Sequence, residues 1–177
     1  MEYTVRSTRT RKSSRLRRAA DGSVIFILCL LILLFIFKVM LEPVRVTAPQ
    51  VSELEEGDLV LVDRVSKYIA EYAVGDIVRA DTGDGLAEYR LAAKGPAVYT
   101  VRGGSAYLNG ALLDESAYSD GWQADTEFEL RIPEGSVLLL PDARQGIEGA
   151  PDAVPYNDII GEVRVRVSPI RRFAFFF

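Results

Sequence analysis

A single apolar run near the N-terminus constrains this chain more than any other feature of its sequence. The run reads VIFILCLLILLFIFKVML from Val24 to Leu41, and Lys38 alone interrupts it. About 18 apolar residues are enough for a helix to cross the hydrocarbon core of a bilayer, and a lysine near one end can reach the headgroups. Because the core of a cleaved signal peptide spans only ~7–15 residues, we expect a retained membrane-spanning helix rather than a removable signal.

Charge is distributed unevenly on the two sides of this run. The chain of 177 residues has a net charge of −4, to which residues 1–20 contribute +6 and residues 42–177 contribute −10. Positive charge before a span stays in the cytoplasm, so we expect a single-pass plasma-membrane protein with an extracytoplasmic C-terminal domain. A basic arm that binds nucleic acid is the competing interpretation. The arm is short and abuts the span, so we expect membrane lipid and no nucleic acid as its partner.

Two residue types that often carry chemistry are absent or nearly so. The chain has no histidine, and its single cysteine, Cys29, lies inside the apolar run. The lack of histidine excludes histidine-based catalytic triads and most zinc and transition-metal sites. The outer domain has no disulfide of its own, so its hydrophobic core must hold it together. We expect neither a metal nor a cofactor.

The region after Pro43 alternates short apolar strands with turn signals and shows little helical periodicity. Asn109-Gly110 is a strong type I′ turn signal between two such strands. Many short strands with evenly spaced turns predict an all-β body, either a barrel or a sandwich. The expected strands are residues 59–65, 77–80, 86–92, 98–102, 106–108, 111–113, 128–132, 137–140, 159–161 and 163–167.

Two short segments allow more than one interpretation. DTGDG (residues 81–85) has carboxylates beside glycines but lacks the ligand spacing of a calcium loop, so we expect a hairpin turn. The C-terminal RRFAFFF (residues 171–177) is either frayed or an interfacial anchor, since aromatic rings favour the headgroup boundary. The predicted organisation is a basic cytoplasmic arm (1–22), a transmembrane helix (23–41), an extracytoplasmic β domain (42–172) and an aromatic tail (173–177).

Four motifs follow the apolar run in a recognisable order. LEEGDLVLVDRVSKYIAEYAVGDIV (54–78) contains two Gly-Asp strand starts, and GGSAYLNGALLDE (103–115) contains the Asn-Gly hairpin and an acidic residue after it. IPEGSVLLLPDAR (132–144) and VPYNDIIGEVRVRVSPIRR (154–172) complete the series. In this order, after an N-terminal anchor, the motifs resemble the type I signal peptidases, membrane-anchored serine proteases that remove signal peptides from secreted proteins.

The resemblance implies a mainly β domain of two antiparallel sheet regions at the membrane surface. It also implies a serine nucleophile and a lysine base. Burial in apolar surroundings lowers the pKa of an ammonium group, so that the neutral amine can accept the serine proton. The substrate is expected to bind in extended form, as an added strand.

The same resemblance leaves both catalytic positions without a suitable residue. Counting along the nucleophile motif puts either Pro49 or Gln50 at the serine, and EYRLAAKG (88–95) puts Tyr89 at the lysine while keeping the arginine that follows. The family's supporting Gly-Asp-Asn-Arg motif is Pro141–Arg144 in this chain. We therefore expect no catalytic residue at these degenerate positions.

A relocated dyad of Ser52 and Lys94, or of Ser52 and Lys67, is the alternative. Lys94 lies five residues beyond Tyr89, and side chains alternate along a strand, so we expect it on the opposite face unless a bulge intervenes. Lys94 also adjoins a Gly-Pro turn, where an ammonium would be hydrated and keep its proton. We interpret Ser52 as a turn residue.

The expected function is that of a signal-peptidase-like protein without the dyad. By resemblance to non-catalytic members associated with Gram-positive pilus assembly, it would bind exported or membrane-tethered polypeptides, namely signal-peptide-bearing preproteins or pilins, as an accessory factor in secretion or pilus assembly. The alternative is an active, divergent type I signal peptidase, a serine endopeptidase that uses Ser52 and Lys94. The sequence does not identify the residues that bind substrate.

Overall fold

The structure is a computed structural model that describes residues 10–83 and 85–176. Side chains are described from Asp21 onward, except those of Ile36, Asp84 and Phe177. The arm before Thr10, and Asp84 of the expected turn, therefore lie outside the described residues. The chain divides into two compact units, residues 1–40 and residues 41–177.

The first unit contains one long helix, α1 (Thr10–Met40). Its segment Asp21–Met40 has a mean hydropathy of 3.0, and none of that segment is buried within the structure. Apolar side chains surround the segment with no polar face toward water, so it could be a membrane anchor, as expected. Leu41, expected to end the span, is instead the first residue of a strand.

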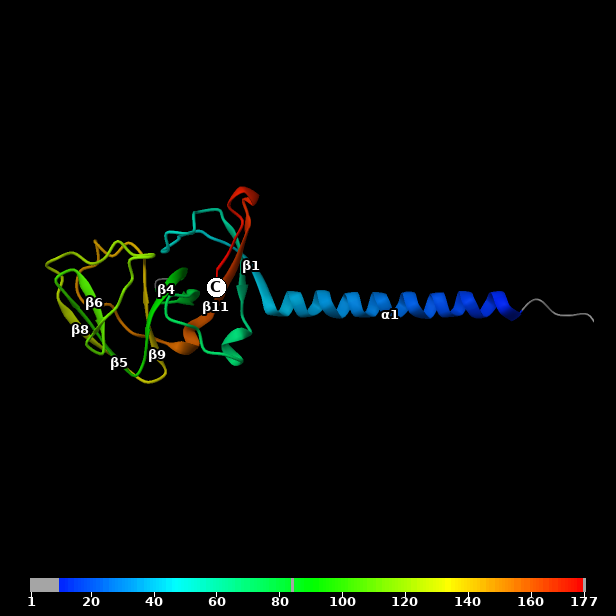
Figure 1. The fold of residues 1–177 in the computed structure, drawn as a ribbon, viewed down its shortest axis with the longest axis horizontal. Coiled ribbons are helices and arrows are strands. Elements are labelled where there is room, and N and C mark those ends of the chain that lie inside the picture. The colour runs from blue at the N-terminus through cyan, green and yellow to red at the C-terminus, as the bar shows by residue number, and fades with distance from the viewer. Residues whose placement is uncertain (1–9, 84, 177) are drawn as a thin grey trace, which may run out of the picture. The chain divides into compact units, whose positions relative to one another are not determined.

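The second unit consists of two antiparallel sheets, in agreement with the expected fold (Figure 1). The larger sheet has the order β1-β2-β11-β3-β4-β9-β10, and the short β12 also pairs with β11. Its strands are β1 (Leu41–Arg45), β2 (Leu59–Asp63), β3 (Ile77–Asp81), β4 (Leu86–Lys94), β9 (Ser136–Leu140), β10 (Val154–Pro155), β11 (Ile159–Ser168) and β12 (Ala174–Phe175).

The smaller sheet has the order β7-β6-β5-β8. Asn109 and Gly110 join β6 to β7 with φ angles of 51° and 82°, the left-handed values that a type I′ turn needs. The chain enters this sheet between β4 and β5 and leaves it between β8 and β9. The strands are β5 (Ala97–Arg102), β6 (Ser105–Leu108), β7 (Ala111–Leu112) and β8 (Phe128–Ile132), and single-turn 3-10 helices η1 (Ser66–Tyr68), η2 (Tyr156–Asp158) and η3 (Ile170–Arg172) follow β2, β10 and β11.

Three clusters of buried side chains form the core of the second unit. The first joins the two sheets and includes Tyr99 and Trp122. The second lies between the β1–β2 loop and strands β2 and β11, and the third includes Tyr72 and Leu139. Each large apolar side chain buried in these clusters contributes about 1.5–3 kcal/mol to stability, so the unit is held together without a disulfide.

Strand β4 carries a bulge that reverses one expectation. Its register with β9 slips by one residue between Leu91 and Ala93, so Ala92 is an extra residue on β4. An extra residue in one strand changes the alternation of side chains beyond it. The expected placement of Lys94 on the face opposite Tyr89 is therefore wrong, because the bulge restores Lys94 to the same face.

Strand β2 ends at Asp63, two residues earlier than expected. The carboxylate of Asp63 accepts hydrogen bonds from the backbone N–H groups of Val65 at 2.9 Å and Ser66 at 3.0 Å. Such side-chain bonds to the following backbone turn the chain out of a strand. Here they lead it into η1.

Strand β11 is continuous where the sequence suggested two shorter strands on either side of residue 162. Gly161 lies so close to β2 that a Cβ atom on it would be 2.4 Å from the carbonyl oxygen of Asp63. Only glycine fits such an approach, which explains why a glycine occurs inside a strand of ten residues.

The aromatic tail is paired with the larger sheet rather than frayed. β12 pairs with β11 through Phe175 with Val165 and Ala174 with Arg166. Phe176 packs against the second core cluster. The sequence suggested fraying or an interfacial anchor, and strand pairing was not foreseen because the partner strand is identified only in the folded chain.

Candidate functional site

The loop between β1 and β2 carries the positions that the resemblance assigns to the nucleophile. Residues 46–58 are termed the strap. The N–H of Val46 donates to the carbonyl of Asp58 at 2.8 Å, which ties the two ends of the strap together. Val51 and Leu54 are buried in the second core cluster. The strap is therefore a closed loop, fixed at its base and by its own apolar side chains.

Ser52 is an exposed strap residue that faces two carboxylates. Its hydroxyl lies 3.0 Å from Oδ2 of Asp142 and 3.2 Å from Oε2 of Glu53. Its backbone N–H donates to the same Asp142 oxygen at 2.8 Å. An ionised carboxylate only accepts hydrogen bonds, so the hydroxyl of Ser52 donates its hydrogen bond to a carboxylate and not to an amine.

Arg90 of β4 joins the strap to the segment after β9. Its guanidinium makes a bidentate ion pair with Asp142, at 3.1 Å to Oδ1 and 2.8 Å to Oδ2, and a second ion pair with Glu53. It also donates to the carbonyl of Gly75 at 3.0 Å and lies 4.4 Å from the ring centroid of Tyr118. Arg90 is only 5% exposed, so protein groups rather than water compensate its charge.

The surroundings of Asp142 keep it ionised. Burial acts to raise the pKa of Asp142, but hydrogen bonds from Arg90 and from the N–H and hydroxyl of Ser52 outweigh burial and lower that pKa. A carboxylate with a lowered pKa is a poor general base near neutrality. The hydroxyl of Ser52 is therefore oriented by Asp142 without being activated.

The candidate bases on β4 have other partners. The ring of Tyr89 packs against the third core cluster, and its hydroxyl lies 3.2 Å from Oγ1 of Thr82. The ammonium of Lys94 binds the carboxylate of Glu71 at 3.0 Å. In the part of the chain that the structure describes, neither side chain has a hydrogen bond to Ser52.

The two lysines considered as bases lie together, apart from Ser52. Nζ of Lys67 donates to the carbonyl of Ile159 at 2.7 Å. Lys67 and Lys94 line the same groove of about 650 Å³, together with Glu71. Ser52 lines a different hollow, so the structure brings the two lysines together but brings neither of them to Ser52.

Ser52 shares its hollow with Pro49 and Gln50, the positions that the resemblance assigns to the nucleophile. This hollow of about 210 Å³ lies between the strap and residues 141–143, and Pro49 and Gln50 line it. The carbonyl of Gln50 accepts a hydrogen bond from the N–H of Asp142 at 2.8 Å, which closes the hollow at that side. Ser52 is therefore the hydroxyl-bearing residue of this hollow, and its acceptors are the carboxylates described above.

A larger groove of about 430 Å³ adjoins the strap. The strap, β4, β11 and β12 all contribute to it, through residues that include Glu53, Gly75, Asp76, Arg90, Glu162, Phe175 and Phe176. Burial, reinforced by the negative charge of Asp76 and opposed by Arg164, raises the pKa of Glu162 to about 7. Glu162 is 3% exposed and binds Arg164 at 2.9 Å. This groove therefore contains a carboxylate that changes charge near neutral pH.

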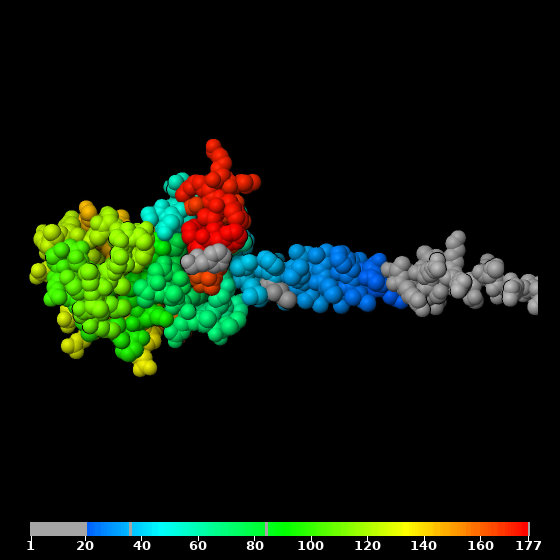
Figure 2. All heavy atoms as spheres, in the orientation of Figure 1, coloured from blue at the N-terminus to red at the C-terminus, as the bar shows by residue number. Residues whose placement is uncertain are grey.

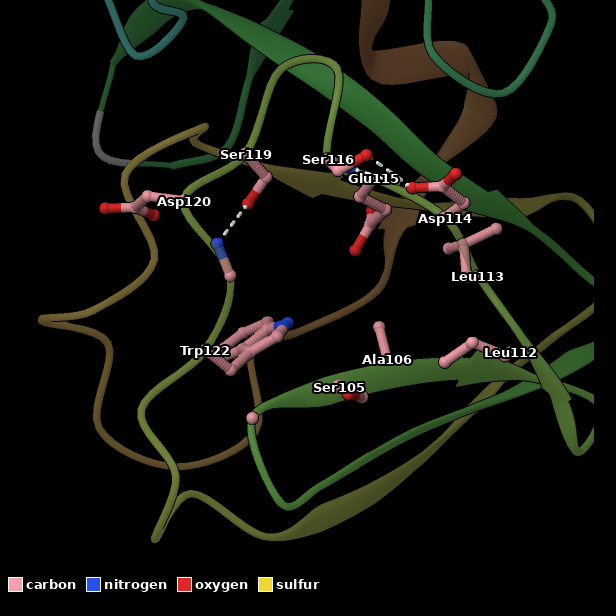
Figure 3. A pocket seen from close by; sticks show the side chains of 12 residues that line it. Ser105, Ala106, Leu112, Leu113, Asp114, Glu115, Ser116, Ser119, Asp120 and Trp122 are labelled. Atoms are coloured by element: carbon pink, nitrogen blue, oxygen red, sulfur yellow. Dashed lines mark hydrogen bonds between the residues drawn. The ribbon is translucent and has the colours of Figure 1, made fainter.

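A further hollow, of about 520 Å³, lies on the smaller sheet (Figure 3). Asp114, Glu115 and Asp120 contribute to its lining. Glu115 is committed to an ion pair with Arg144, which is fully buried and also donates to the hydroxyl of Tyr99 at 3.2 Å. Among residues 10–83 and 85–176, no group of three or more metal-ligating side chains is placed to hold a metal ion. We interpret this hollow as structural.

Sequence reasoning missed three residues that shape the site, namely Glu53, Tyr118 and Glu162. Glu53 lies 37 residues from Arg90 in the sequence, although the two form an ion pair. No local pattern marks such a long-range partner. The available signal was that the chain has the arginine and aspartate of the family's motifs, at Arg90 and Asp142. A buried guanidinium needs more than one acceptor, which points to a further carboxylate near Arg90.

Comparison with known proteins relates the chain to the signal peptidases. The family model described as signal peptidase, peptidase S26, matches residues 19–168. No curated protein matches the chain at a significant level. Among solved structures, a signal peptidase I from Enterococcus faecalis is 20% identical, with 53% of this chain and 97% of that chain covered and a TM-score of 0.42. Because the family match spans most of the chain, from the apolar run through β11, the chain belongs to the peptidase S26 family of signal peptidases.

Proposed function

We propose that this chain is a membrane-anchored signal-peptidase-like protein that lacks the Ser/Lys dyad and binds polypeptides without cutting them. The observation that carries the proposal is the chemistry of the reacting positions. Pro49 and Gln50 offer no nucleophile, and Tyr89 presents a phenol bonded to Thr82 where the family has its lysine. Nucleophilic catalysis of this type needs a hydroxyl within hydrogen-bond reach of a neutral amine.

The scaffold around these positions supports a binding role. Arg90 and Asp142 hold the strap against β4 and β9, and a groove lies open beside the strap. An extended client can gain affinity from backbone hydrogen bonds to a sheet edge and specificity from adjacent grooves. The clients are exported or membrane-tethered polypeptides, either signal-peptide-bearing preproteins or pilins. The role is that of an accessory factor in secretion or pilus assembly.

The proposed topology follows from the basic arm and α1. The N-terminus is cytoplasmic, α1 is the single anchor, and the β domain is extracytoplasmic beside the membrane lipid. Two cysteine variants in a Cys29→Ala background test this arrangement. A membrane-impermeant thiol reagent applied to intact cells is expected to label Ser168→Cys and not Ser7→Cys. Labelling of Ser7→Cys alone would reverse the topology.

One observation favours a second function, an active signal peptidase that uses Ser52 and Lys94. The bulge at Ala92 turns Lys94 to the face of Tyr89, where the resemblance places the base. A working dyad would require Lys94 to leave Glu71 and to approach the Ser52 hydroxyl within ~2.6–3.2 Å. It would also require Ser52 to leave Asp142.

A cleavage assay separates the two functions. The purified full-length protein in detergent is mixed with a signal-peptide-bearing pilin or preprotein, beside the variants Ser52→Ala, Lys94→Ala and Lys67→Ala and the controls Ser116→Ala and Arg131→Ala. We expect wild type to leave the precursor uncut and to co-purify with it. Cleavage by wild type that is lost in Ser52→Ala and in either Lys94→Ala or Lys67→Ala, but kept in both controls, would establish the enzyme and refute the proposal.

A further inference from the structure

The C-terminal strand β12 occupies an edge of β11 that would otherwise be open. β2 covers one edge of β11 over residues 162–168, and β3 covers the other edge over residues 159–162 only. β12 continues the row of β3, with Phe175 paired to Val165. The N–H of Phe176 donates to the carbonyl of Arg164 at 2.8 Å. The tail therefore supplies the backbone partner that β3 does not extend far enough to provide.

The occupied edge borders the groove beside the strap. Phe175 and Phe176 line that groove together with Glu53 and Arg90. Figure 2 shows the red C-terminal segment at the surface, next to the cyan segment that follows α1 in the chain. Phe176 also packs against the apolar cluster beneath the strap. An extended chain at this edge would thus have both a backbone partner and an apolar contact.

The tail is held unequally along its length. The η3 turn before β12 is anchored, because Arg172 donates to the carbonyl of Glu53 at 3.2 Å and binds Asp58 at 3.3 Å, and its own carbonyl accepts from Arg166. β12 is two residues long, and one further backbone bond, from the N–H of Phe176, extends its pairing with β11. Phe175 is 56% exposed and Phe176 is half-buried. Short segments with few buried contacts open locally at low free-energy cost. The strand can therefore leave β11 while the turn remains in place.

We propose that β12 is a displaceable occupant of the client-binding edge of β11. On opening, residues 164–166 of β11 accept an extended client segment as an added strand, with an apolar or aromatic side chain at the position of Phe176. This inference rests on the proposed function, because it assumes that the protein binds clients. It adds the place of binding, the extended form of the bound segment and the fact that the chain covers its own site.

A reversible crosslink between β11 and β12 tests the proposal. Because Phe176 and Arg164 form a hydrogen-bonded pair, Val165 and Phe175 form the neighbouring non-hydrogen-bonded pair, whose Cα atoms lie about 4.5 Å apart in antiparallel sheets. That spacing is compatible with a disulfide. The full-length Val165→Cys/Phe175→Cys variant, in a Cys29→Ala background, locks β12 when oxidised and releases it when reduced.

A crosslink of the same kind in the smaller sheet provides the control. The N–H of Leu113 donates to the carbonyl of Ala106 at 2.9 Å, so Tyr107 and Leu112 are likewise a non-hydrogen-bonded pair. The Tyr107→Cys/Leu112→Cys variant places a disulfide away from β11. The probe is a fluorescein-labelled synthetic signal peptide with a leucine core and an Ala-x-Ala end, titrated into protein in detergent micelles.

We expect oxidation of the Val165→Cys/Phe175→Cys variant to weaken peptide binding at least about tenfold, since it removes the binding-competent state, and reduction to restore it. The control lock should bind the peptide equally in both redox states.

Equal binding by the oxidised and reduced test variant would overturn the inference while leaving the proposed function intact. No binding by wild type or by any variant would refute both. A concentration-dependent dimer that the β11–β12 lock abolishes would assign the edge to a second copy and overturn the client assignment.

Discussion

Two sets of residues around the strap differ sharply in how they are held. Arg90 and Asp142 are both buried, and the two are joined by a bidentate ion pair. Ser52 and Lys94, which the alternative function would use, are exposed or half-exposed, and each is bound to a different carboxylate. The charged support of the site is part of the core, whereas the candidate reacting groups lie at its surface.

The contrast shows that support and reactivity impose different physical demands. Removing one partner of a buried ion pair leaves an uncompensated charge in the protein interior, which is costly for folding whatever the protein does. Exchanging an exposed side chain costs little. A signal-peptidase scaffold that has lost its reacting residues, as we propose for Pro49 and Tyr89, can therefore keep Arg90 and Asp142 for stability.

The largest effect is expected from Arg90→Met. The substitution leaves Asp142 buried without its guanidinium partner, and we expect a loss of about 3–5 kcal/mol in the free energy of unfolding. Urea denaturation of the full-length protein in detergent measures it. Arg131→Met is the matched control, because Arg131 is 85% exposed and lies 4.0 Å from Glu129. If both variants unfold at the same urea concentration, the buried network is not the support described here.

The next effect concerns Glu162 and depends on pH. The pKa of Glu162 is raised from 4.5 to about 7 in the folded protein, so the folded state retains a proton that the unfolded state has lost. Stability should therefore fall as pH rises from about 4.5 through 7, by on the order of 2–3 kcal/mol in total. Glu162→Gln should remove this slope, measured as the urea midpoint at a series of pH values. An unchanged slope in Glu162→Gln, beside the exposed control Glu129→Gln, would contradict the assignment.

Ser52→Ala should have a smaller effect. Only the hydroxyl bonds to Asp142 and Glu53 are lost, because the backbone N–H of residue 52 still donates to Asp142. We expect a loss of about 0.5–1 kcal/mol in stability and unchanged binding of uncut precursor. Ser116→Ala is the control, since Ser116 likewise bonds a nearby aspartate. A loss as large as that of Arg90→Met would remove the distinction between support and reacting groups.

The smallest effect is expected from Lys94→Met. The partner of Lys94, Glu71, is 82% exposed in its side chain, and such ion pairs contribute less than about 0.5 kcal/mol. High salt should abolish even this difference, because solvent screens exposed charges. Thermal unfolding at low and high salt provides the measurement. A loss of several kcal/mol that persists in high salt would mean that Lys94 is paired in the interior.

Much of the fold was predictable because strand periodicity and turn chemistry are local signals. The alternating residues 128–132 form β8 with the expected bounds, and Asn109-Gly110 makes the expected turn between β6 and β7. The apolar run is helical as expected, because its length and apolar composition alone indicate a membrane-spanning helix. These short strands and their turns indicated an all-β body, and the resemblance implied its division into two antiparallel sheet regions.

The site was predictable only in part, because its geometry depends on contacts between distant segments. The resemblance placed Arg90 and Asp142 within family motifs without assigning them a partner. It indicated neither Glu53 nor the raised pKa of Glu162, which arises from burial in the folded chain. The bulge at Ala92 has no sequence signature and alone decides the face of Lys94. Pairing of the tail with β11 was missed because a strand of two residues is too short to show periodicity.

Strand β1 has a mechanical consequence for a tethered protein. It follows α1 without a linker, continues directly into the strap, and its only ladder among the described residues is with β2. A pull on the helix reaches the domain at Leu41 and is resisted first by the five residue pairs between β1 and β2. If that ladder opens, the tension passes straight to the strap and to the hollow that contains Ser52. If α1 is the membrane anchor, as we propose, lateral drag on it would thus reach the candidate site before it reached either sheet as a whole.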